Sequence, residues 1–168
     1  MLMFYNGIAN NGKMITPLMV KEIRKNGKTI EEFESTVVKS SMCSDATLKG
    51  IRECLHDVVW NDTLGTASVN PWGTRKAQSD LVAIAGKTGT AQILEKGYSN
   101  RRHRMSFVGY FPEENPQYSC ICVIHGPQWP YDAGMDCGSV VRHIAEKTMA
   151  YAGEYVIEDG ELVMMVKE

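Results

Sequence analysis

The sequence lacks any long apolar run and any strong excess of one charge. No hydrophobic stretch approaches the roughly 18 residues that a membrane-spanning helix needs, and no signal peptide is recognisable. Eighteen basic against 20 acidic residues give a formal net charge of −2, which argues against nucleic acid or an anionic membrane as the main partner. Internal repeats and low-complexity tracts are also absent. What remains is one globular domain, because 43% hydrophobic residues over 168 positions are too many for a disordered chain.

The five cysteines form no recognisable metal or redox motif. The sequence contains neither a Cys-x-x-Cys pair nor a Cys/His cluster, so no metal site and no cofactor is predicted. Cys120 and Cys122 are two residues apart in a predicted strand, and their side chains should therefore point to the same face. We expect the cysteines to act as small buried hydrophobic residues.

The first half of the chain predicts two helices separated by a hairpin. An amphipathic pattern begins at Met1 and stops at Asn10-Asn11-Gly12, where Gly12 suits a left-handed helix end. Asn26-Gly27 separates two extended stretches, 15–24 and 28–33, and is a strong tight-turn signal. Ser44 then offers an N-cap to a helix ending near Trp60, whose buried face repeats at helical spacing: Leu48, Ile51, Leu55 and Val58.

The second half predicts a sheet covered by a helix. A polar loop over 65–78 leads to three strand-like runs, 81–93, 105–111 and 118–125. A final helix over about 138–152 carries a sheet-facing stripe of Val141, Ile144, Ala145, Thr148 and Ala152. Residues 1–153 therefore predict an α+β domain with an antiparallel sheet and covering helices. Asp159-Gly160 predicts a β-hairpin in the tail, residues 154–168.

The segment that carries chemistry is Ala-Gly-Lys-Thr-Gly-Thr-Ala-Gln, residues 85–92. On an extended strand, alternation puts Thr88 and Thr90 on one face and Lys87 on the other, or twisted toward a cleft at the strand edge. Gly86 and Gly89 add no side chain where a ligand or another backbone comes close. A lysine and two hydroxyls in this pattern suit an anionic group, and backbone N–H groups at a sheet edge can bind an oxyanion.

Two other interpretations fit the same letters. Gly86-Lys87-Thr88 is also the end of a phosphate-binding P-loop, but the required first glycine is replaced by Leu81 and no helical pattern follows. The plainer alternative is a structural β-strand that contains Lys-Thr-Gly by chance. The three letters alone do not separate this alternative from a functional site.

The surrounding sequence resembles the class B penicillin-binding proteins, in which Lys-Thr-Gly is the third active-site motif. Besides residues 85–92, four further segments are similar to that family: Phe4 to Lys13, Thr16-Pro17, Gly65-Thr66-Ala67 and Ser106 to Pro112. The resemblance runs from about Leu2 to Ala152. It implies a partial fold of the penicillin-binding protein and serine β-lactamase type.

The resemblance implies a D,D-transpeptidase that cross-links peptidoglycan stem peptides through a serine acyl-enzyme and binds β-lactams. Lys87 and Thr90 then take part in catalysis, while Gly86, Thr88, Gly89 and Thr90 bind the substrate. Such a parent protein works on the outer side of the bacterial inner membrane, with an N-terminal anchor, among division or elongation proteins. It uses no cofactor, and stem peptides ending in D-Ala-D-Ala are its partners.

The sequence departs from the family pattern in three places. No Ser-x-x-Lys is present; the segment 36–39 has the spacing with threonine, but in the wrong place. The chain is therefore expected to be a C-terminal part that is inactive alone. Ser68-Val69-Asn70 spells the second motif in a loop and is interpreted as coincidence. Cys137-Gly138-Ser139 replaces the usual Ala-Ala-Pro, which leaves the local backbone there unpredicted.

Two further expectations concern function and assembly. A non-catalytic peptidoglycan-binding or partner-binding module, or a serine β-lactamase relative, remains an alternative to the transpeptidase. If the sheet begins with strands outside this sequence, the strand over 118–125 has an open apolar edge. We expect the tail hairpin or a second copy of the chain to cover that edge.

Overall fold

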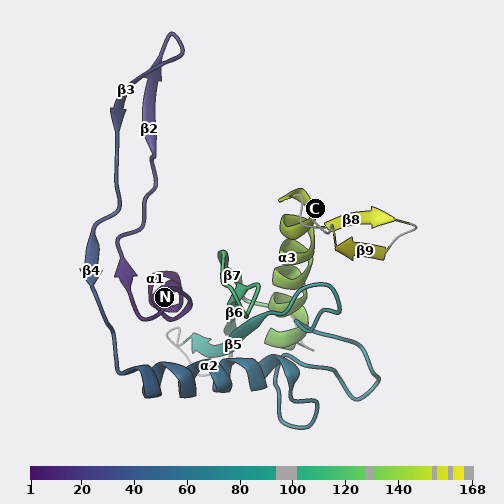
Figure 1. The fold of residues 1–168 in the computed structure, drawn as a ribbon. Helices are drawn as coiled ribbons and strands as arrows, with labels where there is room; N and C mark the ends of the chain where they lie inside the picture. Colours follow the sequence, from purple (N-terminus) through teal and green to yellow (C-terminus); the bar gives the residue numbers. More distant parts are fainter. Residues whose placement is uncertain (94–101, 128–130, 153–154, 159–160, 165–168) are drawn as a thin grey trace.

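The core of the protein is a three-stranded antiparallel sheet with helices on both faces (Figure 1). The computed structural model describes residues 1–93, 102–127, 131–152, 155–158 and 161–164. The sheet has the order β5-β6-β7, formed by β5 (Ala85–Ile93), β6 (Arg102–Phe111) and β7 (Tyr118–His125). The predicted α+β architecture is confirmed.

The strand β5 begins four residues later than predicted. The carbonyl of Ile84 accepts a hydrogen bond from the indole Nε1 of Trp60 at 3.0 Å, and the carbonyl of Ala83 accepts one from Glu113 N at 2.9 Å. Because these carbonyls are bound from outside the ladder, residues 81–84 do not pair as a strand, although Val82 and Ile84 are buried in the core.

Each face of the sheet has its own hydrophobic cluster. On one face, Met105 and Phe107 of β6 pack with Val141, Ala145 and Met149 of α3 (Ser139–Tyr151). Cys120 and Cys122 also pack against this cluster, so their predicted common face is confirmed. The opposite face carries a smaller cluster from the two other helices and the sheet: Ile8, Leu48, Leu55, Ala85 and Tyr110.

The helices α1 (Leu2–Ala9) and α2 (Asp45–Trp60) form as predicted. Asn11 and Gly12 have positive φ at the end of α1, and Gly12 N donates to Gly7 O at 2.8 Å. At the start of α2 the Ser44 hydroxyl accepts from Thr47 N at 3.2 Å. The Arg52 guanidinium donates to the carbonyls of Ile8 and Ala9 at 2.8 and 2.9 Å, which ties α2 to the end of α1.

The hairpin predicted at Asn26-Gly27 forms an arm that projects from the body of the molecule (Figure 1). It consists of β2 (Glu22–Lys25) and β3 (Lys28–Glu32), and its base is the short pair β1 (Met14–Ile15) and β4 (Val37–Lys39). Three residues of the segment 36–39, Val37–Lys39, thus form a strand, and both turn residues have the positive φ that the turn requires.

The start of the last helix differs from the prediction. A π-helical turn, η1 (Gly134–Gly138), precedes α3 in the region where the backbone was left unpredicted. In α3 itself Ile144 is 41% exposed, whereas Met149, which the predicted stripe omits, is 1% exposed. The buried positions follow the spacing i, i+4, i+8 through Val141, Ala145 and Met149, so the sheet contacts a narrower stripe than the sequence suggested.

The tail forms a hairpin of β8 (Tyr155–Glu158) and β9 (Glu161–Met164). The predicted turn residues, Asp159 and Gly160, lie outside the described residues. The hairpin makes a separate two-stranded sheet beside α3 (Figure 1) and does not pair with β7, so the expectation that the tail covers that edge is wrong, while its alternative, a second copy of the chain, stays a prediction. No helix among the described residues is long and apolar enough to cross a membrane.

Candidate active site

The strand β5 forms one of the two edges of the sheet. The side chains of β5 alternate between the two faces of the sheet, as predicted. In the register with β6, Thr88 lies opposite Phe107 and Thr90 opposite Met105, on the face that carries α3. Lys87 lies opposite Val108 and starts from the other face. Its ammonium nevertheless donates to the carbonyl of Thr88 at 3.0 Å and to the Thr88 hydroxyl at 3.3 Å. The structure therefore brings Lys87 and Thr88 together at the strand edge.

The two motif glycines differ in how tightly the neighbouring strand confines them. A Cβ atom on Gly86 would lie 2.5 Å from the carbonyl oxygen of Val108, and one on Gly89 would lie 2.6 Å from the Ser106 hydroxyl. Both contacts come from the neighbouring strand β6. Gly86 thus lies against the backbone of β6, where no side chain fits, whereas the contact at Gly89 is with the end of a side chain that can rotate away.

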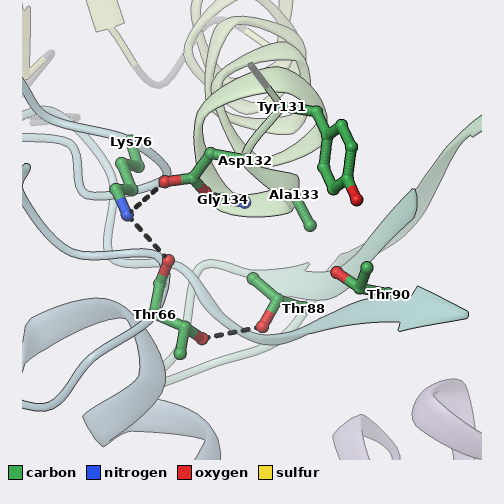
Figure 2. Close-up of a pocket in the computed structure, with 8 residues that line it drawn as sticks. All are labelled: Thr66, Lys76, Thr88, Thr90, Tyr131, Asp132, Ala133 and Gly134. Atoms are coloured by element: carbon green, nitrogen blue, oxygen red, sulfur yellow. Dashed lines mark hydrogen bonds and ion pairs between the residues drawn. The ribbon is translucent and has the colours of Figure 1, made fainter. Parts of the chain in front are cut away.

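A cavity of about 300 Å³ opens beside Thr88 and Thr90 (Figure 2). Its other walls come from the loop between α2 and β5 and from the segment that enters η1. The complete lining is Thr66, Lys76, Thr88, Thr90, Tyr131, Asp132, Ala133 and Gly134. Hydroxyls, an ammonium and a carboxylate are concentrated in this wall, and such a cavity suits a small polar ligand.

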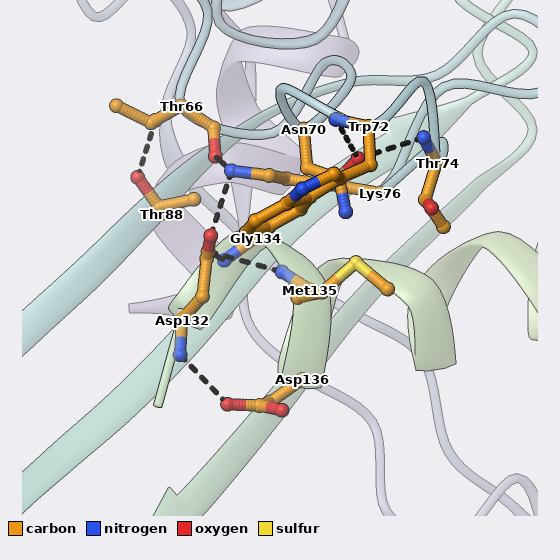
Figure 3. A network of polar contacts seen from close by, with 10 residues as sticks. All are labelled: Thr66, Asn70, Trp72, Thr74, Lys76, Thr88, Asp132, Gly134, Met135 and Asp136. Atoms are coloured by element: carbon orange, nitrogen blue, oxygen red, sulfur yellow. Dashed lines mark hydrogen bonds and ion pairs between the residues drawn. The ribbon is translucent and has the colours of Figure 1, made fainter. Parts of the chain in front are cut away.

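A chain of polar contacts runs through the cavity wall (Figure 3). The Asp132 carboxylate forms an ion pair with the Lys76 ammonium at 2.7 Å, and Lys76 also donates to the carbonyl of Thr66 at 3.2 Å. The hydroxyls of Thr66 and Thr88 are 2.7 Å apart. A continuous path of contacts thus joins the start of η1 to the motif strand.

Asp132 is held as a carboxylate by its surroundings. Burial by itself raises the pKa of this carboxyl, but hydrogen bonds and charge from Lys76, together with the N–H groups of Met135 and Gly134, bring the pKa below its ordinary value. Those N–H groups donate to the same carboxylate oxygen, at 3.1 and 2.8 Å. At neutral pH the cavity therefore contains a balanced pair of charges.

Sequence reasoning missed Lys76, Tyr131 and Asp132. No motif marks them, because Lys76 belongs to a polar loop and the other two precede η1, a turn that the sequence did not predict. The tertiary structure alone brings them to Thr88. Thr66 differs, because it belongs to the family-like segment Gly65-Thr66-Ala67.

The serine and asparagine of the loop sequence Ser68-Val69-Asn70 have structural partners. The buried Ser68 hydroxyl donates to Asp62 at 2.6 Å. The Asn70 side chain accepts from the N–H groups of Trp72 and Thr74, at 3.0 and 2.8 Å, and so organises a turn. These contacts agree with the interpretation that the match to the second motif is a coincidence.

The family of this fold and site is identified by comparison with known sequences. Residues 1–150 match the penicillin binding protein transpeptidase domain family. The chain therefore belongs to this family, as the resemblance around the motif predicted.

Particular relatives agree with this assignment. The chain is 31% identical to the peptidoglycan D,D-transpeptidase FtsI homolog of Mesostigma viride, over 84% of this chain and 25% of the relative. It is also 31% identical to stage V sporulation protein D of Bacillus subtilis, over 83% of this chain and 20% of the relative. The chain thus spans a quarter or less of the length of these two relatives.

Solved structures show the same fold. Penicillin-binding protein 2X from Streptococcus thermophilus superimposes with a TM-score of 0.75 at 20% identity, over 90% of this chain and 22% of the other. Penicillin-binding protein 3 from Mycobacterium tuberculosis, in complex with aztreonam, gives 0.68 at 23% identity, over 99% and 37%.

Proposed function

We propose that β5 is the carboxylate-binding strand of a serine acyl-transfer site that cross-links peptidoglycan stem peptides. In this proposal Lys87 supplies positive charge, and the Thr88 and Thr90 hydroxyls bind the terminal carboxylate of D-Ala-D-Ala. Gly86 and Gly89 keep the strand free of side chains, and the Thr90 N–H is one donor to the oxyanion. The same positions bind the carboxylate of a β-lactam.

One observation supports this proposal above the others. The Lys87 ammonium reaches the Thr88 hydroxyl along the outer edge of the sheet, next to a polar cavity that Thr90 also lines. An ammonium and two hydroxyls at an exposed edge suit a carboxylate, because charge-assisted hydrogen bonds are shorter and stronger than neutral ones. A purely structural strand has no need of this grouping.

The nucleophile of the proposed reaction is not in this sequence. A serine is acylated only when a nearby base activates it, and the sequence has no Ser-x-x-Lys. We propose that the strand functions together with a nucleophile-bearing part of a longer protein, on the outer side of the bacterial inner membrane. The chain alone then binds the carboxylate without being acylated.

The test is an NMR titration of the isotope-labelled chain with acetyl-D-Ala-D-Ala. The acid is expected to shift the amide signals of Lys87, Thr88 and Thr90, and the C-terminal amide of the same peptide is expected to shift them much less. Lys87→Ala should weaken the response, whereas Lys28→Ala, on the exposed strand β3, should not. Equal responses to the acid and its amide, or shifts confined to other residues, would overturn the proposal.

Two alternatives make different predictions. A non-catalytic peptidoglycan-binding or partner-binding module of the same fold would bind the peptide but would never be acylated in its full-length protein. A serine β-lactamase relative would be acylated and would then release hydrolysed penicillin quickly. Labelling the full-length protein with a fluorescent penicillin, and following the loss of the label with time, separates the three.

A further inference from the structure

The cavity beside Thr88 and Thr90 contains two opposite charges whose effects on a bound anion must differ in sign. Lys76 and Asp132 both line this cavity, and their ion pair is 2.7 Å long. The Lys76 side chain is only 12% exposed, so its charge is poorly screened by water. Asp132 is more exposed but is held in the ionised form by Lys76 and by backbone N–H groups.

Hydrogen-bond counting at Thr88 shows what the contacts with Thr66 and Lys87 achieve. A hydroxyl has one proton to donate and two lone pairs that accept. The Thr88 oxygen already accepts from the Lys87 ammonium. If the Thr66 hydroxyl, 2.7 Å away, donates to the same oxygen, both lone pairs are occupied. The only group that Thr88 then has left to offer is its proton, which is what a carboxylate requires.

Lys76 holds Thr66 in place for this contact. Its ammonium bridges the carbonyl of Thr66 and the Asp132 carboxylate, as Figures 2 and 3 show. Asp132 is anchored in turn by the N–H groups of Gly134 and Met135 at the start of η1. The backbone next to Thr66 has no room to move toward η1, because a Cβ on Gly134 would lie 2.3 Å from the Thr66 carbonyl oxygen.

We infer that Lys76 and Asp132 are a specificity-determining pair: Lys76 cancels the negative charge of Asp132 beside the carboxylate site and, through Thr66, leaves the Thr88 proton free for the ligand. This inference rests on the proposed function, because it assumes that a carboxylate binds at Thr88. Lys76 and Asp132 are positioning residues and take no part in bond making.

Two near-isosteric variants separate the pair from a purely structural role. Lys76→Met keeps an unbranched side chain, one heavy atom shorter, but leaves the Asp132 charge uncompensated, so binding of acetyl-D-Ala-D-Ala should weaken by about three- to tenfold. Asp132→Asn leaves the Lys76 charge uncompensated and should strengthen binding of the acid by a similar factor. The C-terminal amide of the peptide, which has no charge, should respond to neither variant by more than about twofold. High salt should reduce both effects.

The hydroxyl contact has its own variants. Thr66→Val removes the hydroxyl at constant shape and is expected to weaken binding of the acid, whereas Thr66→Ser keeps the hydroxyl and should restore it. Amide spectra and thermal unfolding of each variant show whether the fold is intact. If Lys76→Met and Asp132→Asn change binding in the same direction, or change acid and amide equally, the inference is overturned.

A ligand-free measurement distinguishes failure of this inference from failure of the proposed function. Lys76→Met should raise the pKa of Asp132, observed as a change in the carbon-13 carboxyl signal with pH. If the wild-type chain does not bind the acid but the pKa of Asp132 rises as expected, the ion pair is real and the proposed function is wrong. If the pKa of Asp132 is the same with and without Lys76, the pair is not coupled and the inference is wrong.

Discussion

Gly86 and Gly109 lie directly opposite each other on β5 and β6, and neither position has room for a Cβ atom. A Cβ on Gly86 would lie 2.6 Å from the ring of Phe107, and one on Gly109 would lie 2.7 Å from the carbonyl oxygen of Ala85. The pair lets the Phe107 ring pack beside the start of the motif strand. The position of the motif strand β5 thus depends on Gly109, which lies outside the motif.

The first prediction concerns this contact. Gly109→Ala should lower the free energy of unfolding by roughly 1–3 kcal/mol, because the added methyl group would clash with the carbonyl oxygen of Ala85 in the paired strand β5. Gly50→Ala is the matched control. Gly50 lies inside α2 with nothing within 4 Å of its Cβ position, so the change should stabilise the protein by about 1 kcal/mol. Urea unfolding measures both, and equal effects of the two variants would contradict the prediction.

The second prediction concerns acylation. The chain alone, incubated with a fluorescent penicillin, should give no covalent band on a denaturing gel, since it lacks Ser-x-x-Lys. An active penicillin-binding protein run in parallel shows that the reagent works. A band that is stoichiometric with the chain would contradict the expectation that another part of a longer protein supplies the nucleophile.

The third prediction concerns Tyr110, whose buried hydroxyl has no hydrogen-bond partner among the described residues. Tyr110→Phe should therefore preserve stability at pH 7 or increase it by about 1 kcal/mol, since a buried polar group without a partner is costly. Tyr151→Phe, at a position 92% exposed, should have no effect. A loss of stability in Tyr110→Phe would show that the hydroxyl has a partner.

The same residue gives stability a pH dependence. Burial raises the pKa of Tyr110 from 10.0 to about 12, with smaller contributions from Arg52, which lowers it, and Glu113, which raises it. The folded protein keeps this proton between pH 10 and about 12, while the unfolded chain loses it. The ionisation of Tyr110 thus has no effect on stability below pH 10 and lowers the stability of the wild type as the pH rises through that interval. The stability difference between the wild type and Tyr110→Phe should change over this window.

The fourth prediction concerns the acid side. The pKa of Asp132 in the folded protein lies below its ordinary value of 3.8, so its contribution to stability is present above pH 3.8 and is lost as the pH falls through the lower folded value. Asp132→Asn should remove this part of the acid slope in thermal unfolding curves recorded from pH 6 to pH 2. A slope that Asp132→Asn leaves unchanged would mean that the Lys76 pair does not stabilise the fold.

Local sequence signals predicted most elements because short-range interactions decide them. Asn26-Gly27 requires positive φ at both residues whatever surrounds it, and the Ser44 cap needs only the N–H of Thr47. The exceptions occur where groups that are distant in sequence form hydrogen bonds with the backbone. The strand β5 begins later than predicted because Trp60 and Glu113 donate hydrogen bonds to the carbonyls that precede it. The π-helical turn η1 was not predicted because Gly134 to Gly138 carry no local signal for it.

By itself the sequence determined the family and the motif strand, because the spacing and identity of Gly86 to Thr90 are a property of consecutive residues on one extended segment. Only the tertiary structure decided that Lys76 and Asp132 stand beside Thr88. These residues come from segments far apart along the chain, and the packing of η1 against the loop before β5 brings them together. Their pairing depends on three-dimensional proximity, which no local pattern encodes.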